Sequence, residues 1–199
     1  MGLDFSYIQG QTPLDEEEKE GLLIPTIVNR NQLDEVEQLN IEDALLWIQK
    51  KKKLSREQIL TEAFICQVHK KMYSDVWSWA GKYRKTNKNI GVDKWVISVE
   101  LRKLFDDTTF WIEHKVFNED EIAIRFKHRL VSIHCFSNGN GRHSRYMADI
   151  IIQKLFNKPV FTWGGASLIQ RSDFRKQYID AVQKADLGNY SPLIAFSRA

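Results

Sequence analysis

Several signals are scarce or missing in this chain of 199 residues, and each absence argues against a class of protein. A membrane-spanning helix needs roughly eighteen or more apolar residues in a row, and no stretch approaches that length. We also find no signal peptide, so we expect a cytoplasmic protein with no membrane partner. Because the net charge is only +3, the composition gives little reason to expect direct nucleic-acid binding.

Cysteine is equally scarce. The chain has two, Cys66 and Cys135, in separate apolar helical segments and without the spacing of metal ligands. We therefore expect two reduced thiols, neither bridged nor bound to metal.

The abundant residues are those of a packed globule. Hydrophobic residues make up 43% of the chain and include six tryptophans, which argues against a disordered protein. A chain of this length can bury a core without disulfides or metals. With no repeat, low-complexity block or linker, we expect one domain over residues 1–199, with an N-terminal region to about 54 and a core over about 55–199.

Hydrophobic periodicity predicts an all-α fold with one small β-hairpin. The expected helices cover residues 32–51, 56–74, 99–114, 120–134, 140–157, 167–185 and 190–197, after a short acidic turn at 15–20. Ser55 and Ser98 look like helix starts. Between Arg84 and Val99 the helical period fails, and residues 94–97 alternate like a strand after a turn at 91–93.

The most informative segment is the polar loop at 134–145, which separates two apolar helical runs. Gly139 and Gly141 flank Asn140 where a helix begins, so backbone N–H groups are available to an anion. Arg142 and Arg145 follow, three residues apart on one face near the positive end of that helix.

His134, just before the loop, is expected to face the same cavity. A neutral imidazole beside an anion cradle can accept a proton, and this combination favours chemistry on a nucleotide's phosphates. The alternatives are an ordinary turn capped by Asn140 and a histidine that only binds a carbonyl.

This segment resembles the core motif of Fic-domain proteins, HxFx(D/E)GNGRxxR, and differs from it only at Asn138, where the family usually has an acid. Residues 77–84, WSWAGKYR, are similar to the family's W-A-G-x-x-R segment. Residues 12–15, 21–25 and 89–93 resemble the subgroup called mobile mystery protein B. The resemblance implies a helical bundle with a hairpin flap beside the active site.

The resemblance also implies a reaction, protein adenylylation. His134 would deprotonate a Ser, Thr or Tyr hydroxyl of a target protein, which then attacks the α-phosphate of ATP and releases pyrophosphate. The amides of Gly139, Asn140 and Gly141 would hold the α- and β-phosphates. Arg142 would hold the β-phosphate region, and Arg145 would reach the γ-phosphate.

Asn138 complicates this assignment, because the family's acid at this position holds Mg²⁺. An amide oxygen is a weaker ligand for a hard cation, so we expect Asn138 to be an auxiliary or water-mediated ligand of Mg²⁺ bound to the nucleotide. Two alternatives therefore stay open: a catalytically weak nucleotide-binding regulator and a transferase that uses another nucleotide, such as UTP. A zinc site at His134, Cys135 and His143 is disfavoured, since the chain has no HExxH motif.

Glu37 is the second unusual residue, since it falls within the apolar stripe of the helix from Leu33. A carboxylate on a buried face needs a cation. Some Fic proteins carry an inhibitory helix, (S/T)xxxE(G/N), whose Glu binds the second motif arginine. Residues 33–38 could be its degenerate counterpart, although residues 12–17 also fit in part. We expect Glu37 to pair with Arg145; the alternative is a purely structural ion pair.

The predicted flap would align the backbone of the target protein by strand addition. Its expected docking residues are Asn89, Ile90, Gly91, Trp95, Val96 and Ile97. Lys85, Lys88 and Lys94 are expected to face water, whereas Trp79 and Arg84 are expected to brace the flap. The subgroup resemblance implies a bacterial, toxin-like protein encoded on mobile elements beside a helix-turn-helix partner protein.

Overall fold

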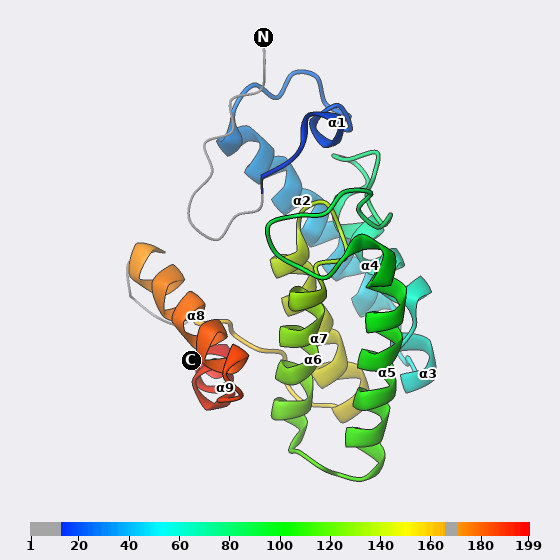
Figure 1. Ribbon diagram of the computed structural model, residues 1–199, viewed down its shortest axis with the longest axis vertical. Helices are drawn as coiled ribbons and strands as arrows, with labels where there is room; N and C mark the ends of the chain where they lie inside the picture. The colour runs from blue at the N-terminus through cyan, green and yellow to red at the C-terminus, as the bar shows by residue number, and fades with distance from the viewer. Residues whose placement is uncertain (1–12, 166–170) are drawn as a thin grey trace.

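The computed structural model describes residues 13–165 and 171–199, and this part of the chain is helical with no β-strand (Figure 1). The α-helices are α1 (Glu16–Lys19), α2 (Arg30–Lys50), α3 (Arg56–Ile59), α4 (Glu62–Tyr73), α5 (Ile97–Glu113), α6 (Glu119–Ile133), α7 (Asn140–Phe156), α8 (Arg171–Asp186) and α9 (Ser191–Arg198). A 3₁₀ turn, η1 (Lys94–Val96), precedes α5. The prediction of an all-α fold is confirmed. Within the described ranges, no helix is long and apolar enough to cross a membrane.

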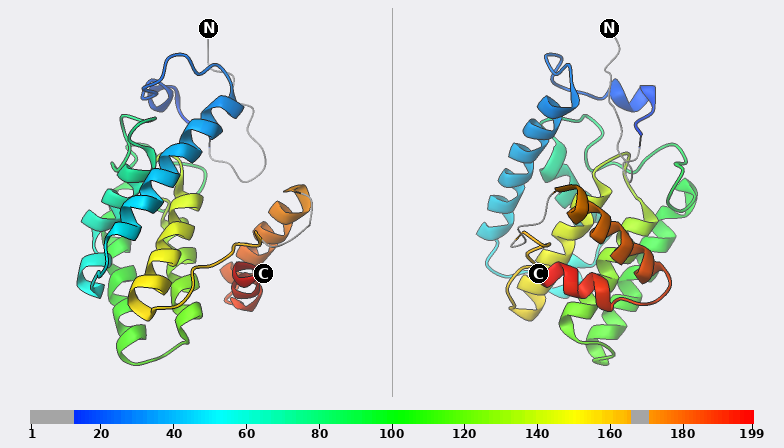
Figure 2. Two further views of the ribbon diagram at one scale, coloured as in Figure 1. Left: turned by 180° about the vertical axis from the view of Figure 1, so that it is seen from behind. Right: turned by 90° about the vertical axis from the view of Figure 1, so that its left-hand side faces the viewer.

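Helices α6 and α7 form the centre of the molecule, with α4 and α5 packed around them and α2 against α4 (Figure 2). Their inward faces are apolar at helical spacing, for example Phe126 and Leu130 on α6 and Met147 and Ile151 on α7, all buried. Helices α8 and α9 pack on each other at one side of this bundle. Burial of the apolar faces is the main stabilising contribution, at roughly 25 cal/mol per Å².

The helix boundaries follow local capping chemistry. The predicted start at Ser55 is confirmed as a capping box with Gln58, but the expected single helix over 56–74 is interrupted after Ile59. There Thr61 accepts a hydrogen bond from the Phe64 amide and starts α4. In the same way Asn29 caps α2, so this helix begins two residues before the predicted position.

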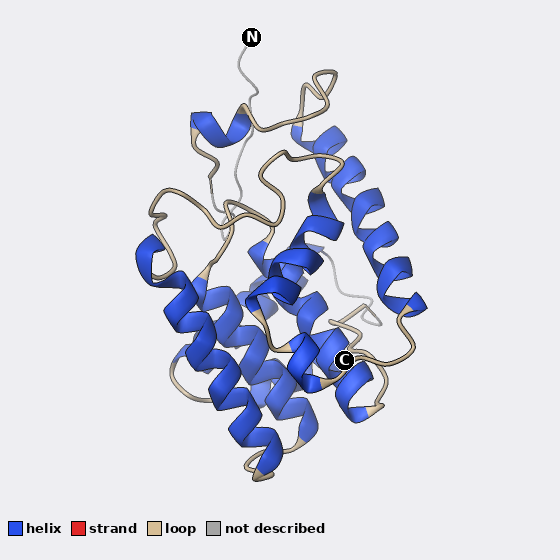
Figure 3. Cartoon of the chain, turned by 90° about the vertical axis from the view of Figure 1, so that its right-hand side faces the viewer, coloured by secondary structure: helices blue, strands red, loops and turns tan. Residues whose placement is uncertain are grey.

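The predicted β-hairpin is wrong, because residues 84–93 form an irregular loop and Lys94–Val96 form a 3₁₀ turn (Figure 3). Local side chains satisfy the amides that a strand would use. Asn87 Oδ1 accepts from the Lys94 amide at 2.8 Å, and Asp93 Oδ1 accepts from the Trp95 amide at 2.9 Å. These two hydrogen bonds start the helical turn that continues into α5. Helix α5 therefore begins at Ile97, one residue before the expected start at Ser98.

Candidate active site

Seven residues of the 134–145 segment line one cavity of about 530 Å³. Its walls come from the end of α6, the turn before α7, the first turns of α2, and α8. The motif residues at the cavity are His134, Asn138, Gly139, Asn140, Gly141, Arg142 and Arg145. Other elements add residues that the sequence did not single out for this site: Arg30, Asp34, Val131, Arg175, Tyr178, Ile179, Val182 and Gln183.

His134 ends α6 in a left-handed conformation, with φ of 56°, and only 4% of it is exposed. Burial, followed by the nearby charges of Arg84 and Lys88, lowers the pKa of the imidazole to about 4. At neutral pH the ring is therefore uncharged and can accept a proton.

Arg84 holds His134 and the following loop in place. Its Nε donates to the His134 carbonyl at 2.7 Å, and its backbone amide donates to the Cys135 carbonyl at 3.0 Å. The same guanidinium donates to the carbonyls of Thr86 and Val92 in the 84–93 loop. The expected bracing role of Arg84 thus has a defined geometry, since one buried side chain links this loop to the histidine.

Gly91 packs against the histidine itself. At its φ of +100°, a Cβ would lie 2.6 Å from His134 Cβ and 3.2 Å from the Ile133 carbonyl. The Val92 amide donates to that carbonyl at 3.3 Å. The loop therefore touches the end of α6 through a residue that has to be glycine.

The turn before α7 is closed by its own side chains. The side chain of Asn140 accepts through Oδ1 from the Phe136 N–H at 3.0 Å and donates through Nδ2 to the Phe136 carbonyl at 2.8 Å. Phe136 is fully buried and stacks on His69, with ring centroids 3.7 Å apart. Asn140 thus shapes the loop with its side chain, while its backbone N–H belongs to the first turn of α7.

His69 was not recognised from the sequence, where it reads as one more residue on the apolar face of a helix. Its Nδ1 accepts from the Gly81 amide at 3.0 Å, so Nε2 carries the hydrogen and donates to the Asn138 carbonyl at 3.0 Å. Burial holds its pKa well below the ordinary value, which keeps this tautomer neutral. His69 therefore ties α4 and the 77–84 segment to the turn.

The two glycines of the turn have different surroundings. Gly139 is left-handed at φ +77°, and a Cβ there would lie 2.6 Å from the Tyr73 ring. Gly141 has helical geometry, and no atom lies within 4 Å of the place where its Cβ would stand. Gly139 is thus required by the fold, whereas Gly141 leaves open space in front of the first-turn amides of α7.

Glu37 pairs with an arginine of α7, but the predicted partner, Arg145, is wrong. Its Oε2 accepts from Arg142 Nη2 at 2.5 Å, and its Oε1 accepts from Trp77 Nε1 at 2.6 Å. Arg145 instead lies against the Tyr178 ring of α8, 5.6 Å from its centroid. Arg145 lies about 4.5 Å farther along the axis of α7 than Arg142, and its side chain there meets α8 and not Glu37.

Glu37 is the more deeply buried partner of this ion pair. Glu37 is 1% exposed, and the Arg142 side chain is 28% exposed. Burial by itself would lower the pKa of Arg142, but the nearby Tyr73 and Glu37 raise it above its ordinary value, so the guanidinium stays charged.

The expected docking residues of the loop are divided by the structure. Ile90 is 50% exposed and lines the cavity, and Trp95 is 82% exposed. Asn89, Gly91 and Val96 are exposed as well. Ile97 is 1% exposed and belongs to the core, so its expected role in docking is wrong, because it opens α5 on the apolar face of that helix.

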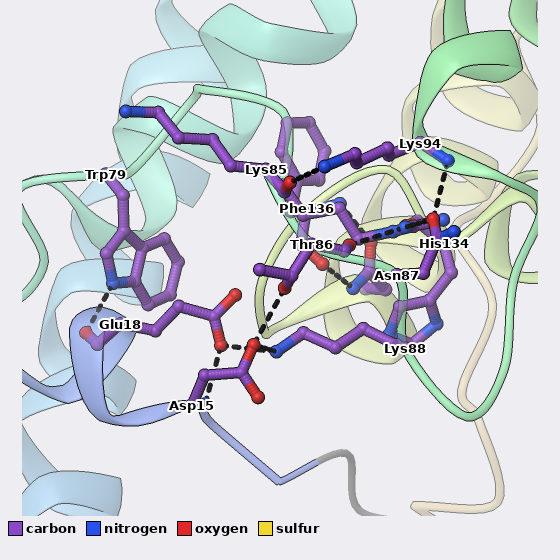
Figure 4. A network of polar contacts seen from close by, with 12 residues as sticks. Asp15, Glu18, Trp79, Lys85, Thr86, Asn87, Lys88, Lys94, His134 and Phe136 are labelled. Atoms are coloured by element: carbon purple, nitrogen blue, oxygen red, sulfur yellow. Dashed lines mark hydrogen bonds and ion pairs between the residues drawn. The ribbon is translucent and has the colours of Figure 1, made fainter.

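Lys88 was also expected to face water, but its side chain points toward Asp15 and Glu18 (Figure 4). Its ammonium is 2.9 Å from Asp15 Oδ2 and 2.5 Å from Glu18 Oε2, and only 4% of the side chain is exposed. Thr86 donates to Asp15 at 2.7 Å, and Trp79 Nε1 donates to the Glu18 carbonyl at 2.9 Å. Residues 15–18 are thereby fixed to the loop beside His134.

The donor set of the cavity suits a metal ion poorly without the nucleotide. Among residues 13–165 and 171–199, no three His, Cys, Asp or Glu side chains are grouped to hold a metal ion. Asn138 is at the cavity, and its Oδ1 already accepts from the Gly139 amide at 2.5 Å. His143 Nε2 is bonded to the Ile65 carbonyl at 3.1 Å, inside the core.

Comparison with known proteins agrees with this geometry. Residues 59–152 match the model of the Fic/DOC family. The protein adenylyltransferase Fic of Aedes aegypti is 25% identical over 147 residues, 72% of this chain and 28% of the relative. The protein of the same name from Nematostella vectensis is 24% identical over 174 residues, 85% of this chain and 39% of the relative. The chain therefore spans well under half the length of these curated relatives.

Solved structures show the same fold. Residues 134–508 of Fic-1 from C. elegans match with a TM-score of 0.67 and 20% identity, over 90% of this chain and 51% of that one. BepC from Bartonella tribocorum, solved with bound AMPPNP, matches with a TM-score of 0.65 and 19% identity, over 92% of this chain and 97% of that one.

Proposed function

We propose that this protein is an adenylyltransferase that moves AMP from ATP to a hydroxyl side chain of a target protein. One observation carries the proposal: a neutral, buried histidine and the amide-rich turn before α7 line the same cavity. The curated relatives that match this chain bear the name protein adenylyltransferase, which supports the same reaction.

The reaction balances with the groups of this site. His134 takes the proton of the target hydroxyl as its oxygen attacks the α-phosphorus. The bond between the α-phosphorus and the bridging oxygen breaks, and pyrophosphate leaves. The first-turn amides of α7, from Asn140 to Arg142, and the guanidinium of Arg145 stabilise the phosphate charge during transfer.

Mg²⁺ would enter with the nucleotide as part of the substrate. Asn138 would offer an amide oxygen to the ion or hold one of its waters, which fits its place at the cavity. The bound ion would neutralise phosphate charge. A neutral ligand here favours a slower transferase as the second candidate, or one selective for another nucleotide donor.

Glu37 would inhibit this transferase through Arg142. While the Glu37–Arg142 ion pair is formed, the carboxylate binds a guanidinium that would otherwise bind phosphate. The carboxylate also brings negative charge close to the proposed position of the phosphates. Inhibition through the first motif arginine replaces our expectation of inhibition through Arg145. Release of the Glu37–Arg142 pair would then accompany nucleotide binding.

The target would dock on the exposed part of the loop, at Asn89, Ile90 and Gly91, with Trp95 and Val96 as apolar neighbours. This backbone lies next to His134, so a target hydroxyl held there would reach the imidazole. From the subgroup resemblance we also propose a bacterial, toxin-like role in the cytoplasm with a helix-turn-helix partner protein, and a single domain over residues 1–199.

The direct test uses ATP labelled at the α-phosphate, Mg²⁺ or Mn²⁺, and cell lysate. We expect label on protein with the wild-type chain and none with His134→Ala. The matched control is His114→Ala, which removes an exposed histidine on the far end of α5 and is expected to keep full transfer. Nucleotide binding without label transfer supports a regulator, and transfer only from another nucleotide supports the other donor.

A further inference from the structure

Two arginines from outside the motif, Arg30 and Arg175, also lie at the cavity. Arg30 is the first residue of α2, and it lines the cavity together with Arg142 and Arg145. Glu37 and Asp34 lie on the same face of α2, because positions 30, 34 and 37 are spaced at i, i+4 and i+7. Arg30 stands about 10 Å along the helix from Glu37, at 1.5 Å per residue.

The guanidinium of Arg30 is only partly satisfied. Its Nε donates to Asp34 Oδ1 at 2.8 Å, and 15% of the side chain is exposed. Its Nη1 is buried and has no hydrogen-bond partner among the described residues. A buried donor without an acceptor costs about 1–3 kcal/mol, and more when it is charged. The Nη1 donor of Arg30 can therefore donate to a further anionic oxygen in addition to the Asp34 carboxylate.

Local helix physics gives no reason for an arginine at this position. A cation in the first turn opposes the helix dipole, at a cost of about 0.3–1 kcal/mol. The order of the pair is also the less favourable one, since an acid N-terminal to a base is preferred at i, i+4. Both costs would be offset if an anionic ligand occupied the cavity beside the first turn of α2.

We propose that Arg30 binds the phosphate tail of the nucleotide, adding to Arg142 and Arg145, and that Asp34 holds the Arg30 guanidinium before the nucleotide binds. On binding, Arg30 exchanges the carboxylate of Asp34, which is 49% exposed and can turn to water, for phosphate oxygens. The inference rests on the proposed function for the identity of the ligand. It makes α2 a helix that both inhibits, through Glu37, and binds substrate, through Arg30.

The test is calorimetric titration with adenosine α,β-methylene triphosphate, which cannot donate AMP, and with AMP, both in Mg²⁺. We expect Arg30→Gln to weaken triphosphate binding about tenfold, which corresponds to ~1.4 kcal/mol. AMP binding should stay within about twofold, because AMP lacks the tail. Unchanged triphosphate binding, or an equal loss for AMP, overturns the inference.

Asp34→Asn leaves the Arg30 side chain in place and guards against a folding defect in the first variant. We expect it to tighten triphosphate binding, and we expect Arg30→Gln/Asp34→Asn to lose that gain. Weaker binding in Asp34→Asn, or a gain that persists in the double variant, overturns the inference. Arg102→Gln, an exposed change on α5, is the control for net charge and should have no effect.

The transfer assay with the wild-type protein separates the two proposals. If Arg30→Gln weakens triphosphate binding but not AMP binding, and no nucleotide is transferred, the proposed reaction fails and the inference that Arg30 binds phosphate stands. If transfer occurs and Arg30→Gln leaves both the KM for ATP and triphosphate binding unchanged, the proposed reaction stands and the Arg30 inference fails.

Discussion

The carboxylate of Glu37 and the guanidinium of Arg142 meet at 2.5 Å across the contact between α2 and α7. Trp77 fixes the second carboxylate oxygen at 2.6 Å, so the acid has little freedom to turn away. The arginine that follows the glycine turn is therefore held by protein before any nucleotide arrives. Whether this contact limits activity can be measured directly.

Glu37→Gly is expected to raise self-modification roughly 5–150-fold, the range of a coupling of 1–3 kcal/mol. The reason is that Arg142 becomes available to phosphate. Incorporation of labelled AMP into the purified protein measures the change. The matched control is Glu35→Gly, which has the same helix cost at an exposed position of α2. Equal activity of the two variants would mean that the Glu37 pair is only structural.

Gly141→Ala and Gly139→Ala should fail in different ways. The alanine methyl at 141 enters open space at a helical position, so we expect an unchanged or slightly higher Tm but at least tenfold weaker ATP binding. At 139 the methyl meets Tyr73 at 2.6 Å in a left-handed conformation, so we expect a loss of stability of more than ~1 kcal/mol. Thermal denaturation and ATP titration of both variants make the comparison. Normal ATP affinity in Gly141→Ala would argue against phosphates at this turn.

Asn138→Asp is expected to lower the Mg²⁺ concentration needed for half-maximal transfer. A carboxylate can still accept from the Gly139 amide and is a stronger ligand for a hard cation than the amide oxygen. A Mg²⁺ titration of the transfer rate at saturating ATP is the measurement. An identical titration curve for the two proteins would show that residue 138 does not face the ion.

Stability is expected to fall as the pH drops from about 6.5 to 4. Burial lowers the pKa of His143 to about 3 and of His134 to about 4, and also lowers the pKa values of His69 and His128. Below pH 6.5, the ordinary pKa of histidine, these side chains bind protons in the unfolded chain but stay unprotonated in the folded one. Unfolding is therefore favoured as the pH falls. Asp149 acts in the opposite sense, because burial raises its pKa to about 7, but it is one group against four histidines.

The net difference of up to three protons predicts a loss of up to roughly 4 kcal/mol of unfolding free energy per pH unit in that window. Urea denaturation at several pH values measures it. His143→Gln should make the dependence shallower by about 1.4 kcal/mol per unit, whereas His114→Gln, at an exposed position, should leave it unchanged. A stability independent of pH between 4 and 6.5 would contradict neutral burial of these side chains.

Much of the fold could be predicted from the sequence, because it depends on periodic apolar faces and local caps. The helices of the centre appear where the 3.6-residue spacing of buried residues is sustained, as on α6 and α7. The failures occur where side chains bind backbone nearby. Asn87 and Asp93 turned an alternating stretch into a helical turn, and Thr61 divided one predicted helix into two.

The residues at the site were predictable from the spacing around the glycine turn, but their partners were not. The choice between Arg142 and Arg145 for Glu37 depends on the rotation of α7 relative to α2, which no local pattern encodes. His69 and Arg30 come from other elements and meet the loop only through tertiary packing. An apolar-face histidine and a first-turn arginine were weak signals that could have drawn attention to them.

The contact between Gly91 and His134 has a consequence for engineering. If a target docks on the 84–93 loop as proposed, a loop transplanted to change that target has to preserve a side-chain-free residue at 91, since even one methyl would lie 2.6 Å from His134 Cβ. Arg84 must be retained as well, because its guanidinium donates to the carbonyls of Thr86 and Val92 in the loop and to the carbonyl of His134. Libraries aimed at redirecting selectivity should therefore vary residues 89, 90, 95 and 96 and leave these two anchors untouched.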